Sequence, residues 1–366
     1  MSTPRTHITA REDDLVAFAN ETTPPERQAT SALPASAGDV AQMAGVSRSQ
    51  VSNFFNHPDL VSSDTTQRIQ AAVESLGYVR NASARQLRLG VNRTVGLMLL
   101  DAWSPYSALV STGVEDELDR RGWSLHFTNT RRDEARELRH LAYFESWHVS
   151  GIIVIPQGPL TGRLEQLARR GIMSVLLDPP ATHPVPDPIS SVRVDHLLGG
   201  RLAAQHLVAQ GGRNFAFVGN PDKVGHSSDR WAGFSGALAD LGMPPPRLIP
   251  TTGMEVGDGT AAAQRLLSRT DISSVDAVFC ANDSIALGVL NALMSSGFTV
   301  PEDVRIVGYD DLPIAGQLAI PLTTIRQPAW QLGATAAAMV VDAIEGSQPV
   351  DQHVILEPEL VARGTA

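Results

Sequence analysis

The sequence has a single cysteine, Cys280, among its 366 residues. One thiol cannot form an internal disulfide, and it cannot supply a zinc site built from several cysteines. Cys280 lies inside a run of apolar residues, so we expect it to be a small side chain of the core.

Long apolar runs are also missing. No stretch approaches the roughly 18 consecutive apolar residues of a transmembrane helix. The segment MSTPRTHITAREDD at the start has no apolar h-region of a secretory signal. We therefore expect a soluble protein of the cytoplasm, with no membrane partner.

The chain lacks the motifs of the common enzyme classes. It has no Gly-x-Ser-x-Gly motif, no glycine-rich phosphate loop and no paired nucleophile and base. Its 10 histidines show no spacing typical of metal ligands, so we expect His196, His206 and His226 to be surface or core residues. We expect no catalytic residue, no metal and no cofactor.

The formal net charge of −10 argues against a chain that binds nucleic acid over its whole surface. It allows one basic module on an acidic body. The length predicts two or three domains.

One stretch, DVAQMAGVSRSQVSNFFN at 39–56, predicts two short helices joined by a tight turn. Apolar residues recur at helical spacing before and after the turn. Ser36 and Ser47 each precede a helix, with Asp or Gln three residues later, which is the spacing of a capping box. Gly45 provides the turn. The pattern is typical of a helix-turn-helix, although a helical hairpin inside a larger core is an alternative.

A third helix is predicted at about 63–76, with Ser62 as its cap and Gly77 at its end. Residues 35–79 would then form a small all-α DNA-binding domain. Residues 1–34, rich in Pro, Ser, Thr and Ala, are expected to be a disordered extension.

Residues 80–93 form the most one-sided basic stretch. They contain Arg80, Arg85, Arg88 and Arg93 and no acidic residue. A solvated linker is one interpretation; we favour a hinge that folds when DNA phosphates neutralise the arginines.

From Thr94 onward, short apolar runs alternate with amphipathic segments, which predicts buried parallel strands and an α/β core at 94–366. The predicted strands are 94–100, 123–129, 151–156, 173–178, 215–220, 277–282 and 305–310. The predicted helices are 107–121, 133–147, 161–170, 196–210, 228–241, 258–269, 283–296 and 329–345. One large sheet or two sheets would fit this pattern.

Polar residues follow the predicted strands. Ligands bind outside the carboxyl ends of strands in open parallel sheets, so a small polar ligand is expected there. The polar residues are Asp101, Asp178, Asn220, Asn282 and Asp310.

Residues 36–366 resemble the LacI (lactose-repressor-like) family of bacterial transcription regulators. The resemblance rests on nine segments in the same order: DVAQMAGVSRSQVSNFFN, VSSDTTQRIQAAVESLGY, NASARQLRLG, TVGLMLLD, RWAGF (230–234), CANDSIALGVL (280–290), VRIVGYDD (304–311), PLTTIRQP (321–328) and PELVARG (358–364). It implies a helix-turn-helix head, a hinge helix and a core of two parallel-sheet subdomains like that of periplasmic binding proteins. The expected subdomains are about 94–193 with 322–346, and about 194–321 with 347–366.

The implied function is a repressor that binds a palindromic DNA operator as a homodimer and responds to a small-molecule effector, such as a sugar. A solute-binding protein is the alternative, which the attached head opposes. In a docked recognition helix, Arg48 could read guanine and Asn53 adenine, with Ser49 and Gln50 beside them. The residues suited to phosphate contacts are Ser36, Ser47, Ser52, Asn56 and Ser62.

The family hinge pattern matches Asn81, Ala84, Arg85 and Leu87, with Leu87 at the position that enters the minor groove. Many relatives have Pro where Arg80 stands. The effector contacts of the family map onto Ser104, Tyr106, Asp178, Arg230, Asn282 and Asp310, and Asp101 is added as a strand-end residue. Trp330 is expected to line the cleft or, in preference, to pack in the core.

Overall fold

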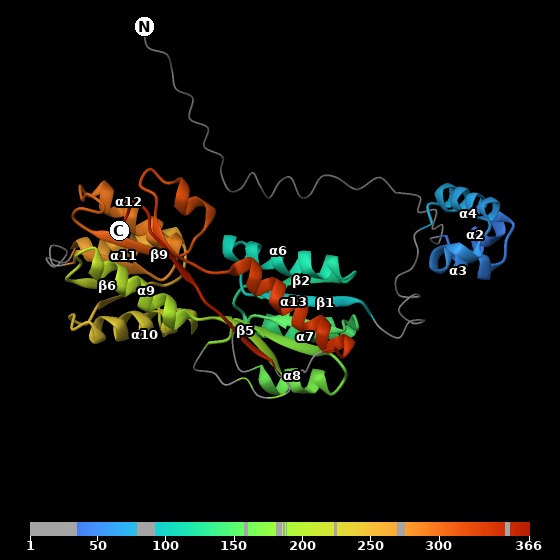
Figure 1. The fold of residues 1–366 in the computed structure, drawn as a ribbon, viewed down its shortest axis with the longest axis horizontal. Coiled ribbons are helices and arrows are strands. Elements are labelled where there is room, and N and C mark those ends of the chain that lie inside the picture. Colours follow the sequence, from blue (N-terminus) through green and yellow to red (C-terminus); the bar gives the residue numbers. More distant parts are fainter. Residues whose placement is uncertain are drawn as a thin grey trace, which may run out of the picture. The chain divides into compact units, whose positions relative to one another are not determined.

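The structure, a computed structural model, describes residues 35–78, 92–156, 160–180, 185, 187, 189–222, 225–268, 275–347 and 352–366 (Figure 1). The expected disordered extension at 1–34 and nearly all of the expected hinge therefore lie outside the described residues. The chain divides into two compact units, residues 1–88 and 89–366. Their described parts are called here the head and the core, and each is considered on its own.

The head is a small helical domain. Val40, Val51 and Ile69, one from each of the three α-helices, are completely or almost completely buried against one another. Both predicted capping boxes are present, and Gly45 and Gly77 have the left-handed backbone that ends the first and third helices. The helices are α2 (Ala37–Ala44), α3 (Arg48–Asn56), η1 (Pro58–Leu60) and α4 (Ser63–Leu76).

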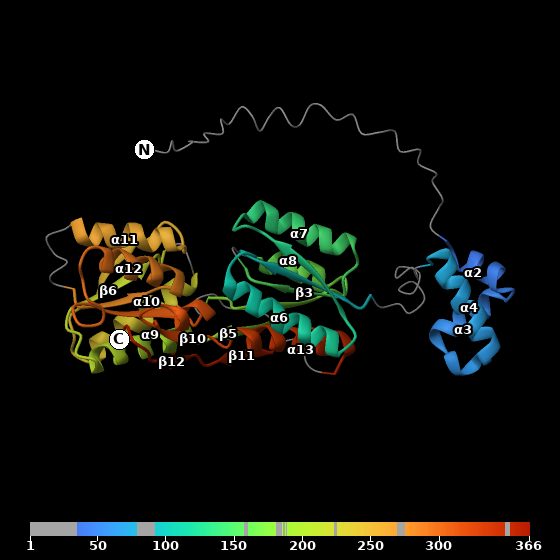
Figure 2. The ribbon, with the colours of Figure 1, turned by 90° about the horizontal axis from the view of Figure 1, so that it is seen from above.

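The first half of the core, the N-subdomain, is a parallel sheet with helices on both faces (Figure 2). Side chains of β1 alternate between two clusters: Leu97 faces α6 and α13, whereas Met98 faces α7 and α8. The strand order is β11 (His353–Leu356), β5 (Ser190–Val194), β4 (Met173–Leu177), β3 (Gly151–Val154), β1 (Thr94–Leu99), β2 (Ser124–Asn129). The helices are α6 (Pro105–Arg120), α7 (Glu134–Ser146), α8 (Thr161–Ala168) and α13 (Ala329–Glu345).

The second half, the C-subdomain, repeats this plan. Helices α9 (His196–Ala209) and α10 (Gly225–Asp240) cover one face of its sheet, and α11 (Val256–Ser268) and α12 (Asp283–Ser295) cover the other (Figure 2). Only the edge strand β12 is antiparallel among the paired strands described. The strand order is β12 (Glu359–Val361), β10 (Thr323–Arg326), β9 (Arg305–Asp310), β8 (Ala277–Cys280), β6 (Phe215–Gly219), β7 (Arg247–Pro250). A short helix, η3 (Pro313–Gln317), follows β9.

The predicted fold class is confirmed, with two sheets rather than one. Every predicted strand and helix of the core is present, and Cys280 is buried in β8 as expected. Five strands were not predicted, because each has only three to five residues and most carry polar side chains: β5, β7, β10, β11 and β12. Among the described residues, no helix is long and apolar enough to cross a bilayer.

The expected subdomain division is wrong at two places. The strand β10 pairs with β9 in the C-subdomain, so the chain returns to the N-subdomain after 326 and not at 322. The strand β11 pairs with β5 in the N-subdomain, although 347–366 was assigned entirely to the other half. The partner of a short strand is fixed by distant pairing, which the local sequence does not specify.

Glycines set the distance between paired helices in both halves of the core. A Cβ atom on Gly113 of α6 would collide with the carbonyl oxygen of Trp330 in α13, and one on Gly333 would collide with that of Val110. Reciprocal glycines make the same close approach between α9 and α10 and between α11 and α12. These are Gly200 with Gly233, and Gly259 with Gly288.

We expect Gly113→Ala to destabilise the protein, because the added methyl must push two helix backbones apart. Overpacking of this kind typically costs about 1–3 kcal/mol. The matched control is Gly236→Ala on α10, where a Cβ atom meets nothing within 4 Å. That control should raise the free energy of unfolding by about 0.5–1 kcal/mol. Urea unfolding of the variants measures both, and equal effects in the two would contradict the close-approach argument.

Candidate functional site

The head presents the first turn of α3 to solvent. Arg48, Ser49 and Gln50 are all exposed there, where a recognition helix contacts base edges. Ser52 and Asn53 are partly buried one turn later, and Asn56 is exposed at the end of the helix. The residues proposed to read bases, Arg48 and Asn53, therefore lie on one helix together with Ser49 and Gln50.

Three of the four serines expected at phosphates are helix caps in this structure. The hydroxyls of Ser36, Ser47 and Ser62 accept hydrogen bonds from backbone N–H groups at the starts of α2, α3 and α4. The Ser36 and Ser62 hydroxyls also donate, to Asp39 Oδ2 at 2.7 Å and to Thr65 Oγ1 at 3.0 Å, and the Ser47 hydroxyl lies 2.7 Å from that of Ser49. A phosphate contact from one of these serines would therefore replace a hydrogen bond within the head.

The side chain of Arg48 lies over the start of α2. Its Nη2 atom is 2.7 Å from the position that a Cβ atom on Gly38 would occupy. Hydrogen bonds from Ser36 lower the pKa of the nearby Asp39 carboxyl, and the positive charge of Arg48 contributes to this. Gly38 therefore leaves room for the guanidinium of Arg48 at the junction of the two helices.

Two groups of predicted DNA contacts remain. The Asn56 amide donates to the Ser52 carbonyl oxygen at 2.7 Å, so part of its hydrogen-bonding capacity is used within α3. The expected hinge contacts, Asn81, Ala84, Arg85 and Leu87, lie outside the described residues.

In the core, Asp178 follows β4 at the carboxyl edge of the N-subdomain sheet and is almost completely buried. One carboxylate oxygen accepts from the Val194 N–H at 3.0 Å, and the other lies 3.0 Å from His196 Nε2. Burial raises the pKa of Asp178, but the two nearby imidazoles, those of His196 and His226, and these hydrogen bonds outweigh it, so the pKa lies below its usual value. Asp178 is therefore an ionised carboxylate inside the protein.

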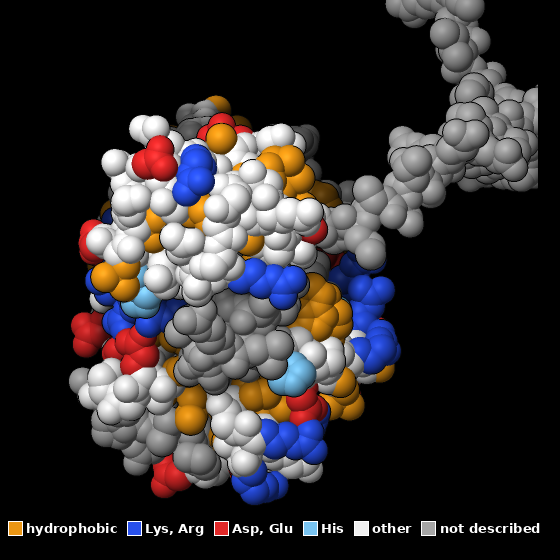
Figure 3. Space-filling model, turned by 90° about the vertical axis from the view of Figure 1, so that its right-hand side faces the viewer, with side chains coloured by type: hydrophobic (Ala, Val, Ile, Leu, Met, Phe, Trp, Pro, Cys, Tyr) orange, Lys and Arg blue, Asp and Glu red, His pale blue; other side chains and the backbone are white. Residues whose placement is uncertain are grey.

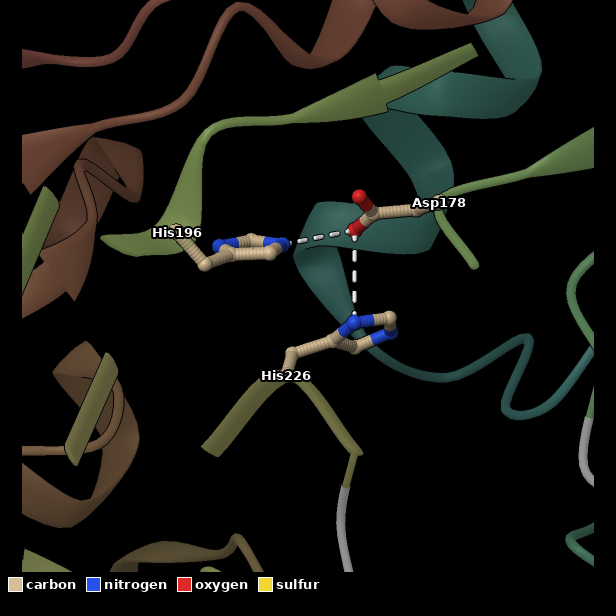
Figure 4. Close-up of side chains that lie close together, drawn as sticks. All are labelled: Asp178, His196 and His226. Carbon is tan, nitrogen blue, oxygen red and sulfur yellow. Dashed lines mark hydrogen bonds and ion pairs between the residues drawn. The ribbon is translucent and has the colours of Figure 1, made fainter. Parts of the chain in front are cut away.

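His196, at the start of α9, connects this carboxylate to the C-subdomain (Figure 4). Its Nδ1 atom is 2.9 Å from the Tyr309 hydroxyl. The ring of Tyr309 lies under the guanidinium of Arg230, with the Cζ atom 3.7 Å from the ring centroid. Burial lowers the pKa of His196, and this effect outweighs the negative charge of Asp178, which raises it. The imidazole is therefore a neutral connector between the two sheets.

Arg230 on α10 and Asp310 at the end of β9 complete the polar cluster. Arg230 donates to the carbonyl oxygen of Ala281 at 2.5 Å, and its Nη1 atom is 3.9 Å from Asp310. Gln327 donates to the same Asp310 oxygen at 2.5 Å. Burial raises the pKa of Asp310 to about 6, although Arg230 and Gln327 oppose the rise.

Tyr106, on the first turn of α6, faces the same cluster. Burial, together with the charges of Asp178 and Asp310, raises the pKa of its phenol. Its hydroxyl is buried and has no hydrogen-bond partner among the described residues, and the same is true of Gln327 Oε1. Buried polar atoms without partners are uncommon, and a polar ligand would satisfy them.

The predicted effector residues therefore separate into two sets. The structure brings Asp178, Arg230, Asp310 and Tyr106 together. The side chain of Asp101 instead accepts from the Trp103 N–H, and Ser104 precedes α6. Asn282 caps α12 and donates to the Met254 carbonyl, so its structural role is the one that the geometry supports.

The sequence analysis missed His196, His226 and Tyr309, and the expected role of Trp330 is wrong. No local spacing marks the two histidines, because His196 lies 18 residues after Asp178 and His226 lies 30 residues after His196. Trp330 is half exposed and donates to Asp116, so it neither lies in the core nor joins the cluster.

The face shown in Figure 3 mixes acidic, basic and apolar side chains without a large patch of one charge.

Comparison with known proteins shows which family has both a helical head and a core of this kind. A family model described as bacterial regulatory proteins, lacI family, matches residues 38–81, and one described as a periplasmic binding protein-like domain matches 204–366. The ribose operon repressor of Escherichia coli (strain K12) is 32% identical over 330 residues, which cover 90% of this chain and 98% of that protein. The chain belongs to the LacI family. Its members are DNA-binding transcription regulators, so the head of this LacI-family chain is a DNA-binding domain.

Two solved structures extend the comparison over the whole fold. The lac repressor dimer bound to operator and an anti-inducer has a TM-score of 0.81 and 27% identity, covering 91% of this chain and 99% of that one. A complex of the transcriptional regulator CelR with cellobiose has a TM-score of 0.69 and 30% identity, covering 91% and 100%.

In this LacI-family core, a buried carboxylate supports the turn that carries Asp310. Asp283 accepts hydrogen bonds from the Leu312 N–H at 2.8 Å and from the Thr324 hydroxyl at 2.6 Å. Burial raises its pKa to about 8, with the charge of Asp310 acting in the same direction. The folded protein therefore holds a proton here that the unfolded chain, with a pKa near 3.8, releases.

A raised pKa of this kind gives stability that is complete below about pH 4 and is lost as the pH rises through about 8. Asp283→Asn does not titrate. Its amide oxygen can accept from the Leu312 N–H, and its NH2 group can donate to the Thr324 hydroxyl oxygen, which reverses the direction of that second hydrogen bond. Its free energy of unfolding, relative to that of the unchanged protein, should therefore increase from about pH 5 to about pH 8. Urea unfolding across this range, with the exposed Asp240→Asn as control, measures the effect. A difference that stays constant with pH would contradict it.

Proposed function

We propose that this LacI-family regulator is a homodimeric repressor whose operator affinity is controlled by a small polyhydroxylated metabolite, such as a sugar. The observation that carries this proposal is the polar cluster of Asp178, Arg230 and Asp310 at the carboxyl edges of the two sheets. Ligands bind parallel sheets at that edge. The ligand named for one related structure is cellobiose, and a ribose operon repressor is among the relatives.

The chemistry of the cluster suits a neutral polyol. Carboxylates accept hydrogen bonds from hydroxyl groups, and the guanidinium of Arg230 donates in a fixed plane. The unpartnered Tyr106 hydroxyl and Gln327 carbonyl oxygen add one donor and two acceptors. We assign effector binding first to Asp178, Arg230, Asp310 and Tyr106. Asp101, Ser104 and Asn282 are weaker candidates, because local hydrogen bonds or capping positions account for them.

On the DNA side, we propose that Arg48 and Asn53 read bases and that Ser49 and Gln50 lie beside them. The proposed phosphate contacts are Ser36, Ser47, Ser52, Asn56 and Ser62, and the proposed hinge contacts are Asn81, Ala84, Arg85 and Leu87. We further propose that this regulator has no catalytic activity of its own and works in the cytoplasm, where the chromosome lies.

Control of operator affinity follows from linkage. An effector changes DNA affinity only if it binds the two shapes of the core unequally. Because the cluster takes residues from both subdomains, a ligand there contacts both halves at once. Its binding therefore depends on the separation of the two subdomains. In a dimer, a change in that separation would change the spacing of the two heads and so the affinity for the operator.

A gel-shift titration on the DNA upstream of the protein's own gene tests DNA recognition. The unchanged protein should bind one palindromic site, with an affinity that falls as salt rises. Arg48→Ala should lower the preference for that site by about 1–3 kcal/mol, because a bidentate contact to guanine is lost. Arg213→Ala, in the core, is the control. Binding without sequence preference, or without an effect of Arg48→Ala, would reject the proposal.

Arg230→Ala tests the effector site. A thermal-shift screen of sugars first identifies a ligand that raises the unfolding temperature of the unchanged protein. Arg230→Ala should abolish that shift and the effect of the ligand on operator binding, while operator binding without ligand remains. Arg230→Lys keeps a positive charge beside Asp310 and so controls for stability. An unchanged dose-response in Arg230→Ala would place the effector elsewhere.

A further inference from the structure

Three side chains of the polar cluster, Asp178, His196 and His226, converge in a way that the polyol proposal does not explain. Asp178, His196 and His226 each offer one ligand atom, and these atoms all lie within 4.8 Å of one another. Figure 4 shows the two imidazole rings on different sides of the carboxylate, each with a nitrogen directed at the same oxygen. His196 Nε2 is 3.0 Å from Asp178 Oδ2, and His226 Nδ1 is 3.7 Å from it.

From this geometry we propose that Asp178, His196 and His226 bind a divalent transition-metal cation of the Zn²⁺ class. Donor atoms bonded at about 2.1 Å to one tetrahedral ion lie about 3.4 Å apart. The distances of 3.0 and 3.7 Å from Asp178 Oδ2 to the two histidine nitrogens bracket that value, and all three ligand atoms lie within 4.8 Å of one another. Side-chain rotations would then place the three donors around one ion. Two imidazoles and one carboxylate are a ligand set that Zn²⁺ uses, with a fourth position left open.

Hydrogen bonds within the cluster account for Asp178 and His196 but not for the position of His226. Its Nδ1 atom is buried and has no hydrogen-bond partner in the part of the chain that the structure describes. A metal ion bonded to this nitrogen would satisfy it. The ring remains about one-fifth exposed, which leaves a way in for an ion.

The other two ligands are already held in place. The Oδ1 atom of Asp178 accepts from the Val194 N–H, so the Oδ2 atom points at the histidines. His196 Nδ1 contacts the Tyr309 hydroxyl at 2.9 Å, and a partner on the outer ring nitrogen is what metal-bound histidines usually have. Loading requires the tautomer with the proton on Nδ1. Metal binding would therefore break the Asp178–His196 hydrogen bond and the 3.4 Å contact from Arg230 Nε to His196 Nδ1. Three coordination bonds would replace them.

An ion here would join the two subdomains, because Asp178 belongs to one and both histidines belong to the other. Through the proposed function, it would act on the same cleft closure as the polyol effector. The buried Tyr106 hydroxyl, which interacts with Asp178 and has no hydrogen-bond partner among the described residues, would hold an oxygen atom of the effector or a water molecule as the fourth ligand.

Direct binding tests the site without reference to DNA. The tag-free full-length protein, stripped with EDTA and dialysed, is titrated with Zn²⁺ in a calorimeter. We expect about one tightly bound ion per chain. His226→Gln and Asp178→Asn should each weaken binding by at least about tenfold. The matched control is His140→Ala on α7, a histidine outside the cluster, which should bind as the unchanged protein does.

Two further measurements make the result decisive. Thermal unfolding without metal establishes that each variant is folded, and Co²⁺ loading should give the intense visible absorption of a four-coordinate ion, which His226→Gln should lose. Absence of stoichiometric Zn²⁺ binding, or equal binding in His226→Gln and His140→Ala, would overturn the proposal and leave a plain Asp178–His196 hydrogen bond. Failure of operator binding would reject the proposed function instead, without changing the outcome of the metal titration.

Discussion

The contact between Asp178 and His196 is the interaction on which the rest of the core depends. It places an ionised carboxylate out of water, at a cost of several kcal/mol unless its partners are all present. Those partners come from both subdomains: the Val194 N–H on one oxygen and the imidazole on the other. The imidazole in turn contacts Tyr309, which supports Arg230. Binding of a ligand, a proton or an ion to any of these side chains therefore changes the free energy of association of the two subdomains.

The helix pairs explain why such a change would move whole subdomains. Reciprocal glycines bring α9 against α10 and α6 against α13 at backbone contact, so neither pair can slide without a collision. Interiors packed in this way transmit displacement and do not absorb it. The chain passes between the subdomains only three times in the described core: after β5, before α13 and between β11 and β12. Rotation at these crossings is the motion that the architecture leaves available.

The sequence predicted the parts of this structure that depend on local pattern. Period and length identified the buried strands and their helices, and the rule for carboxyl ends of parallel strands selected Asp178 and Asp310. It could not assign β10 and β11 to their sheets, because pairing is decided by residues far away in the chain. The same limit hid His196 and His226, since they meet Asp178 only after both subdomains have folded. Asn282 shows a different limit of that rule, because a polar residue at the end of a strand can also be the cap of the next helix.

The head raises a related question about which polar residues are available to DNA. On α3, Gln50 Oε1 accepts from the Ser47 N–H, and the Ser47 and Ser49 hydroxyls contact each other at 2.7 Å. Redirecting Gln50 to a base would break a capping box worth about 1 kcal/mol. Arg48 and Asn53 make no side-chain hydrogen bond within the described head, so they can turn to bases without that loss. Each good bidentate contact contributes about 1–3 kcal/mol of discrimination. Sequence preference should therefore rest mainly on these two residues, with Gln50 and the serines fixing the helix that presents them.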